Sequence, residues 1–358
     1  MKRILINSRF LTRPITGVER YAREMVKALH DVGAAQYDFI LAVPQKLTFD
    51  SQTDIELFQD HSNLPGHFWE QIRLPIIMNK TKADLLWSPC TSGPLLVKKQ
   101  VVTIHDASIF ACPESFRRTY RTYYKVLLRL LSGQVLRVIT DSEFSKSELI
   151  SHNVCARRQI SVIHCGINTQ AFRNHDRKIQ LDCDQYVLSI GSRDPRKNVS
   201  RLLKAWQLVP PELKHGMKLV IAGGSGPGFA KEVLGNVPND VTFLGYVPED
   251  VLPSLYAGAA IFVYPSTYEG FGFPPLEAMA CDTPAIVSNV ASLSEVCGNA
   301  ALYCDPFDVN DISEKVVRLL SDAPLQAQLR ERGPERVKQF TWQKSATQLT
   351  RIFEEELN

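Results

Sequence analysis

The chain has 358 residues, 44% of them hydrophobic and 22% charged, a composition that is typical of a soluble globular protein and excludes a disordered one. This length exceeds one ordinary core, so two domains are expected. No apolar run reaches the roughly 18 residues of a membrane-spanning helix, and the N-terminus turns polar by Asn7, too early for a signal peptide. We therefore expect a cytosolic protein whose eight scattered cysteines, which lack zinc-type spacing, are reduced thiols.

Charge is divided unevenly along the chain. Residues 1–180 hold 25 Lys and Arg against 16 Asp and Glu, whereas residues 181–358 hold 16 against 22. Such a split suggests that the N-terminal half faces something anionic.

The first half alternates short apolar runs with helix-like stretches. The predicted strands are Arg3–Ile6, Phe39–Val43, Leu85–Trp87, Val101–Ile104, Val138–Thr140 and Ser161–Ile163. The predicted helices are Val18–His30, Ser115–Leu131 and Glu143–His152. This alternation favours a parallel sheet with helices on its faces.

Between a first strand and a first helix lies the segment Thr16–Tyr21, whose Gly17 would let backbone amides approach a phosphate. An ordinary turn glycine is the alternative. His105, followed by Asp106, ends another predicted strand, where an imidazole can hydrogen-bond a ligand or stabilise developing charge. A purely structural histidine is the alternative there.

The segment from Ser115 to Thr140 contains no acidic residue. Its cations recur mostly at four-residue intervals, with tyrosines and leucines interleaved: Arg117, Arg118, Arg121, Lys125 and Arg129. A basic amphipathic helix of this kind can lie on an anionic membrane surface, so residues 115–137 are a candidate membrane face. A solvated outer face above a core-facing apolar stripe explains the pattern equally well.

The second half has the clearer rhythm, with a non-periodic linker near Asn168–Asp184 before it. Its predicted strands are Tyr186–Ile190, Lys218–Ala222, Val241–Leu244, Ile261–Tyr264, Ala285–Ser288 and Ala301–Cys304, and its helices include Val199–Leu208 and Glu249–Ala257. Nearly continuous apolar strands indicate a parallel sheet covered on both faces. The predicted fold is therefore α/β, with two doubly wound Rossmann-like domains, residues 1–172 and 173–340.

Cations gather where the strand Tyr186–Ile190 ends. Gly191 permits a turn, and Arg193, Arg196 and Lys197 follow it. Ligands of open parallel sheets bind at this edge, where preorganised cations stabilise an anionic leaving group. A solvated charged turn is the alternative.

A pair of carboxylates follows the strand Ile261–Tyr264. Glu269 lies in the turn, Gly270 and Gly272 allow the backbone to approach a ligand closely, and Glu277 falls near the first turn of a helix expected to start at Pro274 or Pro275. The amides of Phe271, Gly272 and Phe273 would form an anion site at that helix end. Without a ligand, the same pattern would only place favourable acidic charge at a helix N-terminus.

The run E-G-F-G-F-P-P-L-E from Glu269 to Glu277 resembles the signature of family 4 glycosyltransferases, which have the two-domain GT-B fold with its domains facing across a cleft. The resemblance implies that Glu269 holds the donor sugar, that Glu277 holds the ribose, and that the backbone from Gly270 to Phe273 meets the diphosphate. The Gly191–Asn198 stretch is similar to the family's G-x-x-x-x-R-K-N segment, but Ser192 stands where many members carry Arg. Which of Arg193 and Arg196 contacts the diphosphate therefore stays open.

Further segments carry the resemblance across most of the chain. Gly245-Tyr246-Val247-Pro248 resembles the loop under the nucleotide base, where Tyr246 and Val247 would lie, and Gly17 matches the family's first glycine loop. His105-Asp106 and the segment Phe68–Pro75 resemble a mannosyltransferase-like subgroup; we assign no role to the second. Residues 341–358 would pack back onto the first domain.

The resemblance implies a retaining hexosyltransferase with Glu269, His105 and Lys197 as catalytic residues. The donor would be a nucleotide sugar, GDP-mannose by subgroup similarity, and the acceptor a glycan or lipid-linked glycan of a surface polysaccharide such as O-antigen. The enzyme would be cytoplasmic, on the inner face of the plasma membrane, without nucleic acid, cofactor or metal. The D-x-D run Asp182-Cys183-Asp184 precedes a strand and so points away from the expected site.

Three alternatives remain from sequence. The donor could be a UDP-sugar. The chain could be a non-catalytic nucleotide-sugar binding module. It could also be another enzyme on doubly wound domains, such as a phosphorylase or a dehydrogenase, although the dinucleotide fingerprint G-x-G-x-x-G is missing.

Overall fold

The computed structural model describes residues 1–44, 54–173, 181–183, 185–191, 194–224 and 237–358. The chain forms two compact units. The first comprises residues 1–111, 122–166 and 341–358, and the second comprises residues 112–121 and 167–340. Among the described residues, we find no helix with both the length and the apolar character needed to cross a bilayer.

The first unit is built on a seven-stranded sheet in the order β3-β2-β1-β4-β5-β6-β7, with every neighbouring pair parallel. The strands are β1 Lys2–Asn7, β2 Tyr37–Val43, β3 Glu56–Gln59, β4 Leu85–Ser88, β5 Gln100–Thr103, β6 Arg137–Thr140 and β7 Ile160–Val162. The order reverses direction between β1 and β4, which makes this the switch point of a doubly wound sheet.

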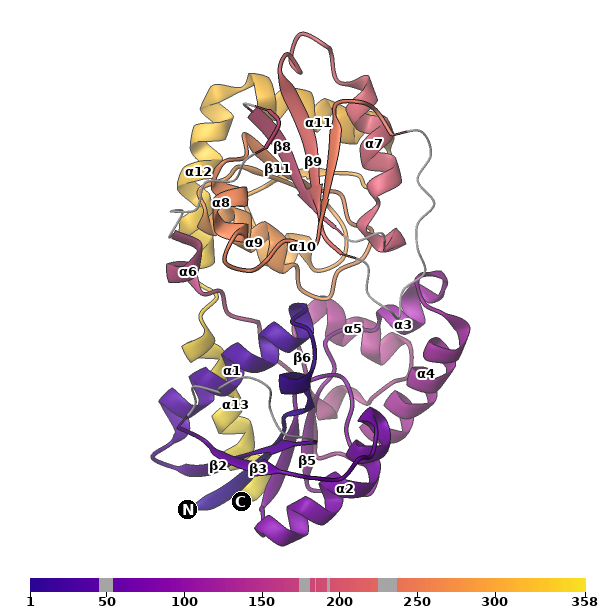
Figure 1. Ribbon diagram of the computed structural model, residues 1–358, viewed down its shortest axis with the longest axis vertical. Coiled ribbons are helices and arrows are strands. Elements are labelled where there is room, and N and C mark those ends of the chain that lie inside the picture. The colour runs from indigo at the N-terminus through magenta and orange to yellow at the C-terminus, as the bar shows by residue number, and fades with distance from the viewer. Residues whose placement is uncertain (45–53, 174–180, 184, 192–193, 225–236) are drawn as a thin grey trace. The chain divides into compact units, whose positions relative to one another are not determined.

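Helices cover both faces of this sheet (Figure 1). They are α1 Gly17–Gly33, α2 Gly66–Thr81, α3 Ser108–Ala111, α4 Arg118–Ser132, α5 Glu143–Ser151 and α13 Trp342–Leu357. The C-terminal helix α13 lies beside α1, and its Phe353 packs against Tyr37 and Trp87 of the sheet. The C-terminal helix is therefore part of the hydrophobic core of the first unit, together with strands from the N-terminal part of the chain.

Helix α2 covers the other face and was not predicted. Its Trp69, Leu74 and Ile77 are fully buried against side chains of β1, β2 and β4. Pro75 lies inside this helix, where its missing N–H normally weakens a helix. Burial of the apolar face compensates for that loss. Because this stabilisation comes from contacts with the sheet and not from local propensity, the local sequence alone gives only a weak helical signal.

The second unit has a six-stranded parallel sheet in the order β10-β9-β8-β11-β12-β13. The strands are β8 Gln185–Ile190, β9 Met217–Ala222, β10 Val241–Gly245, β11 Ile261–Tyr264, β12 Ala285–Ser288 and β13 Leu302–Cys304. Here the order reverses between β8 and β11. Two doubly wound α/β sheets in series were predicted, and the fold confirms them.

The second sheet is likewise covered on both faces. Its helices are α6 Thr169–Arg173, α7 Val199–Leu208, α8 Leu252–Ala257, α9 Phe273–Ala280, α10 Leu293–Cys297, α11 Val309–Ser321 and α12 Ala323–Val337. Helices α7 and α11 supply one hydrophobic cluster with the strands, while α9 contacts β11 and β12. The predicted helix Val199–Leu208 coincides with α7, whereas the helix predicted from Ser115 starts three residues later, after a short 3₁₀ turn.

Candidate functional site

The switch point of the second sheet brings two predicted residues into contact. Lys197 follows β8 in a 3₁₀ turn, Pro195–Lys197, and Glu269 follows β11. Lys197 Nζ lies 2.6 Å from Glu269 Oε1, and both side chains are largely buried. Because the carboxyl ends of parallel strands share one edge, residues 72 positions apart in sequence form one ion pair.

Tyr264, the last residue of β11, lies between these charges. Its hydroxyl accepts a hydrogen bond from Lys197 Nζ at 2.7 Å and donates one to Glu269 Oε1 at 2.8 Å. Burial raises the pKa of Tyr264 well above its usual value; Glu269 raises it further, as does Glu277 by a smaller amount, while Arg196 opposes them. Glu269, Glu277 and Arg196 therefore all lie close enough to change the pKa of the buried Tyr264 hydroxyl.

Ser266 completes the surroundings of Glu269. Its Oγ lies 2.5 Å from Glu269 Oε1 and 2.8 Å from the carbonyl oxygen of Arg196. All the donors recorded for Glu269 among the described residues converge on Oε1. The carboxylate is thus held by one oxygen, which leaves Oε2 as an acceptor for a ligand.

Asn198 fastens the loops of this edge together. It is 2% exposed and adopts a left-handed backbone (φ 60°) that asparagine tolerates better than most residues. Its Nδ2 donates to the carbonyl oxygens of Pro265 at 2.9 Å and Pro306 at 2.7 Å. One side chain after β8 therefore fixes the loops after β11 and β13.

Arg196 is already engaged inside the second unit. Its guanidinium donates from Nη2 to Asp194 Oδ2 at 2.7 Å and stacks over the Phe116 ring, 5.3 Å from the centroid. A role at the diphosphate would require Arg196 to act from this position or to leave it. Arg193, the other predicted arginine, lies outside the described residues.

The glycine-rich turn leads directly into α9, as predicted. Gly272 has φ 109°, and a Cβ there would lie 2.7 Å from Leu293 Cδ2, so glycine is required. Phe271 is buried against Phe273. The hydroxyl of Ser292 lies within 2.9 Å of the carbonyl oxygens of Glu269 and Phe271. The turn, whose first residue is Gly270, is thus held by the hydroxyl of Ser292 and by the buried ring of Phe271.

Glu277 lies on α9 and is 2% exposed. It accepts a hydrogen bond from the Tyr256 hydroxyl at 2.7 Å.

At the other end of the edge, Gly245 ends β10 with φ 68°, and Tyr246 follows it with two thirds of its surface exposed, beside a half-buried Val247. An exposed aromatic ring after a fixed turn can lie against a nucleotide base.

The remaining predicted residues belong to the first unit. Gly17 is exposed at the first position of α1, and the N-cap residue Thr16 hydrogen-bonds through its hydroxyl to Glu19. His105 is buried at the end of the β5 segment, with Nδ1 2.8 Å from Asp141 Oδ2 and Nε2 3.0 Å from the Pro89 carbonyl oxygen.

Both ring nitrogens of His105 therefore face acceptors. Burial lowers the pKa of His105, but the charge and hydrogen bond of Asp141 outweigh burial, and the pKa is raised overall. This arrangement favours the doubly protonated imidazolium. A hydrogen bond from the ring to a sugar would require one of the two present contacts to break.

Sequence analysis assigned no role to Tyr264, Ser266 or Asn198. The available signals were weak: Tyr264 is the last residue of a strand whose other members are apolar, and Asn198 ends the segment that resembles G-x-x-x-x-R-K-N, but neither signal names the contacts that these residues make. No group of metal-binding side chains occurs in the part of the chain that the structure describes.

Comparison with known proteins identifies the two halves. Residues 15–171 match the family model described as Glycosyltransferase Family 4, and residues 172–336 match Glycosyl transferases group 1. The sucrose-phosphate synthase of Thermosynechococcus elongatus has the same fold, with a TM-score of 0.75 and 20% identity over 99% of both chains.

Two curated bacterial relatives align over much of their length. The O-antigen chain mannosyltransferase RfbU of Salmonella typhimurium is 30% identical, covering 67% of this chain and 65% of its own. The O-antigen chain mannosyltransferase B of Escherichia coli is 33% identical, covering 94% of this chain and 95% of its own. The chain is therefore a member of glycosyltransferase family 4, an enzyme of the GT-B fold.

Proposed function

We propose that this glycosyltransferase transfers mannose from GDP-mannose, with retained anomeric configuration, to a glycan or lipid-linked glycan of an O-antigen-like polysaccharide. The sugar and the pathway are supported by the two mannosyltransferase relatives. The observation that carries the site is the Lys197–Tyr264–Glu269 cluster at the switch point of the second sheet.

The cluster fits the charges of the proposed reaction. The bond from the anomeric carbon to the diphosphate oxygen breaks, a bond to the acceptor oxygen forms on the same face, and the acceptor proton passes to the leaving phosphate oxygen. Lys197 offsets the charge that grows on the diphosphate, and the N-terminal amides of α9 bind the same diphosphate. Glu269 Oε2 accepts a hydroxyl of the sugar, and Glu277 accepts the ribose hydroxyls. His105 of the first unit is the third catalytic residue of the proposal, as an imidazolium whose two N–H groups face Asp141 and Pro89, and no metal or cofactor takes part.

A donor panel tests this proposal. The full-length enzyme is incubated with GDP-mannose, UDP-glucose and UDP-galactose, with and without an α-linked mannose disaccharide, and nucleotide release and product configuration are followed by NMR. We expect acceptor-dependent release from GDP-mannose and an α-configured product. Turnover with a UDP-sugar instead would contradict the donor, a β-configured product would contradict retention, and donor binding without turnover would contradict the proposed reaction.

We also propose that the enzyme works at the cytoplasmic face of the membrane and that α4 contacts anionic lipid. The predicted core-facing stripe exists, since Tyr124, Leu127, Leu128 and Leu131 are buried. The outer face is nevertheless apolar as well: Tyr123, Val126 and Leu130 are 41%, 55% and 49% exposed. Exposed apolar residues among cations are typical of a helix that lies in a membrane interface.

Vesicle binding distinguishes this surface from a solvated one. The double variant Val126→Glu/Leu130→Glu should lose most of the binding to vesicles that contain phosphatidylglycerol, because it places charge where lipid would lie. Leu208→Glu, an exposed leucine of α7, is the matched control and should bind as the wild type does. Unchanged sedimentation of the double variant with these vesicles would remove α4 from the proposal.

A further inference from the structure

The turn between β11 and α9 contains a buried amide for which the described residues supply no acceptor. This amide is the N–H of Gly272, a buried residue at the N-cap position of α9. A buried backbone N–H is nearly always hydrogen-bonded in a folded protein, to the chain itself, to water or to a ligand. The Gly272 amide is therefore available to an acceptor that comes from outside the chain.

The direction of this amide is set by Ser292. The Phe271–Gly272 peptide bond is trans, so the Phe271 carbonyl and the Gly272 N–H point in opposite directions. Ser292 is fully buried, and its hydroxyl donates to the carbonyl oxygens of Phe271 at 2.8 Å and of Glu269 at 2.9 Å. The hydroxyl thus orients the peptide plane, and the Gly272 N–H points away from Ser292.

Helix α10, which follows Ser292, is fastened at its other end by α12. Arg336 donates from Nε to the carbonyl oxygen of Val296 at 2.8 Å and from Nη2 to that of Glu295. Its guanidinium stacks over the Phe340 ring, 5.1 Å from the centroid, and Phe340 packs edge-on against Phe271 at 5.7 Å. The serine that orients the turn is therefore held in place by contacts that return to the same turn.

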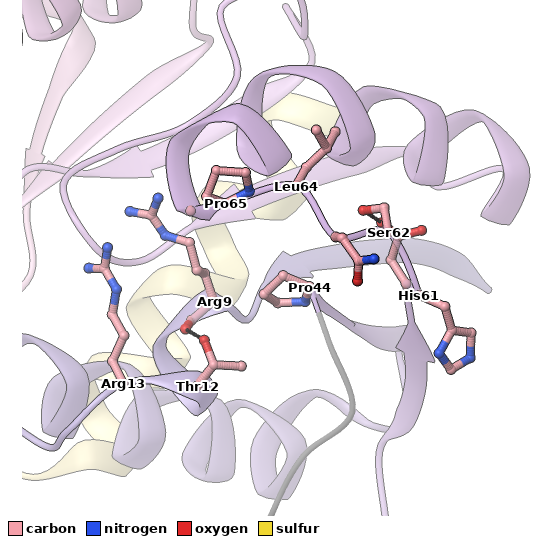
Figure 2. A pocket seen from close by; sticks show the side chains of 11 residues that line it. Arg9, Thr12, Arg13, Pro44, His61, Ser62, Leu64 and Pro65 are labelled. Atoms are coloured by element: carbon pink, nitrogen blue, oxygen red, sulfur yellow. Dashed lines mark hydrogen bonds between the residues drawn. The ribbon is translucent and has the colours of Figure 1, made fainter.

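The first unit offers a rival site to an anion, in a pocket of about 520 Å³. Figure 2 shows the Arg9 and Arg13 side chains extending along one side of this pocket. Arg9 Nη1 lies 3.5 Å from Glu70 Oε2, and Arg13 Nη1 lies 3.8 Å from Glu19 Oε1. Glu70 accepts hydrogen bonds from two further members of the same buried network, Asn7 and Ser92. An anion would have to compete with these carboxylates, whereas no acceptor in the described chain competes for the Gly272 amide.

We infer that Ser292 is a positioning residue for the donor diphosphate: its hydroxyl holds the Phe271 carbonyl oxygen and thereby aims the Gly272 N–H at a phosphate oxygen. This role rests on the proposed function for the identity of the ligand. Hydrogen bonds from an amide to an ionised oxygen are short and strong, and they weaken steeply when the angle changes. Ser292 would therefore act on the donor through one peptide plane, without touching it.

One NMR signal reports on both ends of this peptide. Phe271–Gly272 is the only Phe-Gly pair in the sequence, so the full-length enzyme labelled with ¹³C-carbonyl phenylalanine and ¹⁵N-glycine gives a single HNCO signal. The carbonyl frequency of this signal reports the hydrogen bond from Ser292, and the amide proton frequency reports the ligand. Titration with inorganic pyrophosphate, GDP or UDP should shift the amide proton downfield, because the N–H then donates to a charged oxygen.

Ser292→Ala should move the carbonyl frequency and reduce the ligand-induced shift of the Gly272 amide. It should also weaken GDP binding, measured by calorimetry, by about tenfold, which corresponds to one hydrogen bond to a charged group. Ser294→Ala is the matched control, since Ser294 is exposed on α10, and it should behave as the wild type does. Arg13→Gln, in the pocket of the first unit, should likewise leave the pyrophosphate-induced shift unchanged.

The outcomes separate this role from the proposed function. A Gly272 amide that responds to UDP and not to GDP contradicts GDP-mannose as donor but supports Ser292, provided that Ser292→Ala reduces the response. An amide that responds to none of the three ligands in the wild type overturns the role, even if GDP-mannose is turned over, and this measurement needs no variant to fold. A full response in Ser292→Ala overturns it too. Pyrophosphate binding that is lost in Arg13→Gln, with an unmoved Gly272 signal, would assign the anion to the first unit instead.

Discussion

Replacing Lys197 by alanine should lower kcat for sugar transfer by about 10²–10³-fold, the effect typical of removing one preorganised group that stabilises transition-state charge. Lys197 is the cation held 2.6 Å from Glu269, and in the proposed reaction its loss would leave the departing diphosphate without that charge. The effect should fall mainly on kcat, because the charge is larger in the transition state than in the bound donor. Steady-state release of nucleotide diphosphate measures it.

Lys204→Ala provides the matched control, since Lys204 is exposed on α7, the helix that follows the 3₁₀ turn of Lys197. It should keep wild-type kcat. The unfolding temperature of each variant, with and without GDP, shows that the site remains folded. A Lys197→Ala enzyme with kcat within about threefold of the wild type would remove Lys197 from the reaction, since such a factor corresponds to less than one ordinary hydrogen bond.

Replacing Glu70 by leucine should destabilise the first unit by about 3–5 kcal/mol, the cost of breaking a buried ion pair from one side. The change leaves Arg9 buried without its carboxylate and deprives Asn7 and Ser92 of their acceptor. Urea unfolding followed by tryptophan fluorescence measures it in a Trp206→Phe background, where the remaining tryptophans all belong to the first unit.

Two comparisons make the Glu70 prediction specific. Glu56→Leu, on the exposed edge of β3, should change stability by less than about 0.5 kcal/mol. Adding Arg9→Met to Glu70→Leu should recover part of the loss, because no unpaired charge then remains. If Glu70→Leu changed the free energy of unfolding no more than Glu56→Leu does, the buried contacts of Glu70 would contribute nothing to stability.

The same network predicts an acid response. Burial alone would raise the pKa of Glu70, but the hydrogen bond of His67 and the charge of Arg9 lower it overall. A lowered folded pKa gives stability that is complete above the unfolded value near 4.5 and is lost as pH falls through the folded value. The gap in stability between wild type and Glu70→Leu should therefore narrow below pH 4.5.

The fold was predictable because both sheets consist of short, almost uniformly apolar strands. Sequence patterns failed to predict two elements, β3 and α2, whose structure depends on tertiary packing more than on local sequence. Strand β3, Glu56–Gln59, lies at the sheet edge with no fully buried residue, and only two of its four residues are apolar. Helix α2 contains Pro75 and forms because Trp69 and Leu74 are buried against the sheet. Propensity cannot anticipate either result.

The candidate site was predictable where the backbone dictates the residue. Gly272 and the pair Lys197 and Glu269 follow from turn geometry and from the carboxyl-edge rule, together with the family resemblance. Tyr264 and Asn198 could not be found in this way, because their roles depend on which distant loops the sheet brings beside them. The buried contacts of Glu70 were missed for the same reason.

The Asn198 clamp, meaning its two hydrogen bonds to the Pro265 and Pro306 carbonyl oxygens, joins some loops of the second unit and not others. Loops after β8, β11 and β13 share its two hydrogen bonds, so loss of the Asn198 side chain would release the loops that follow β11 and β13 from the loop that carries Lys197. Tyr246, two thirds exposed after β10, has no hydrogen bond to that clamp among the described residues. If Tyr246 lies under the base as we propose, redesign of base preference could begin at the β10 turn, which the two hydrogen bonds of Asn198 do not reach.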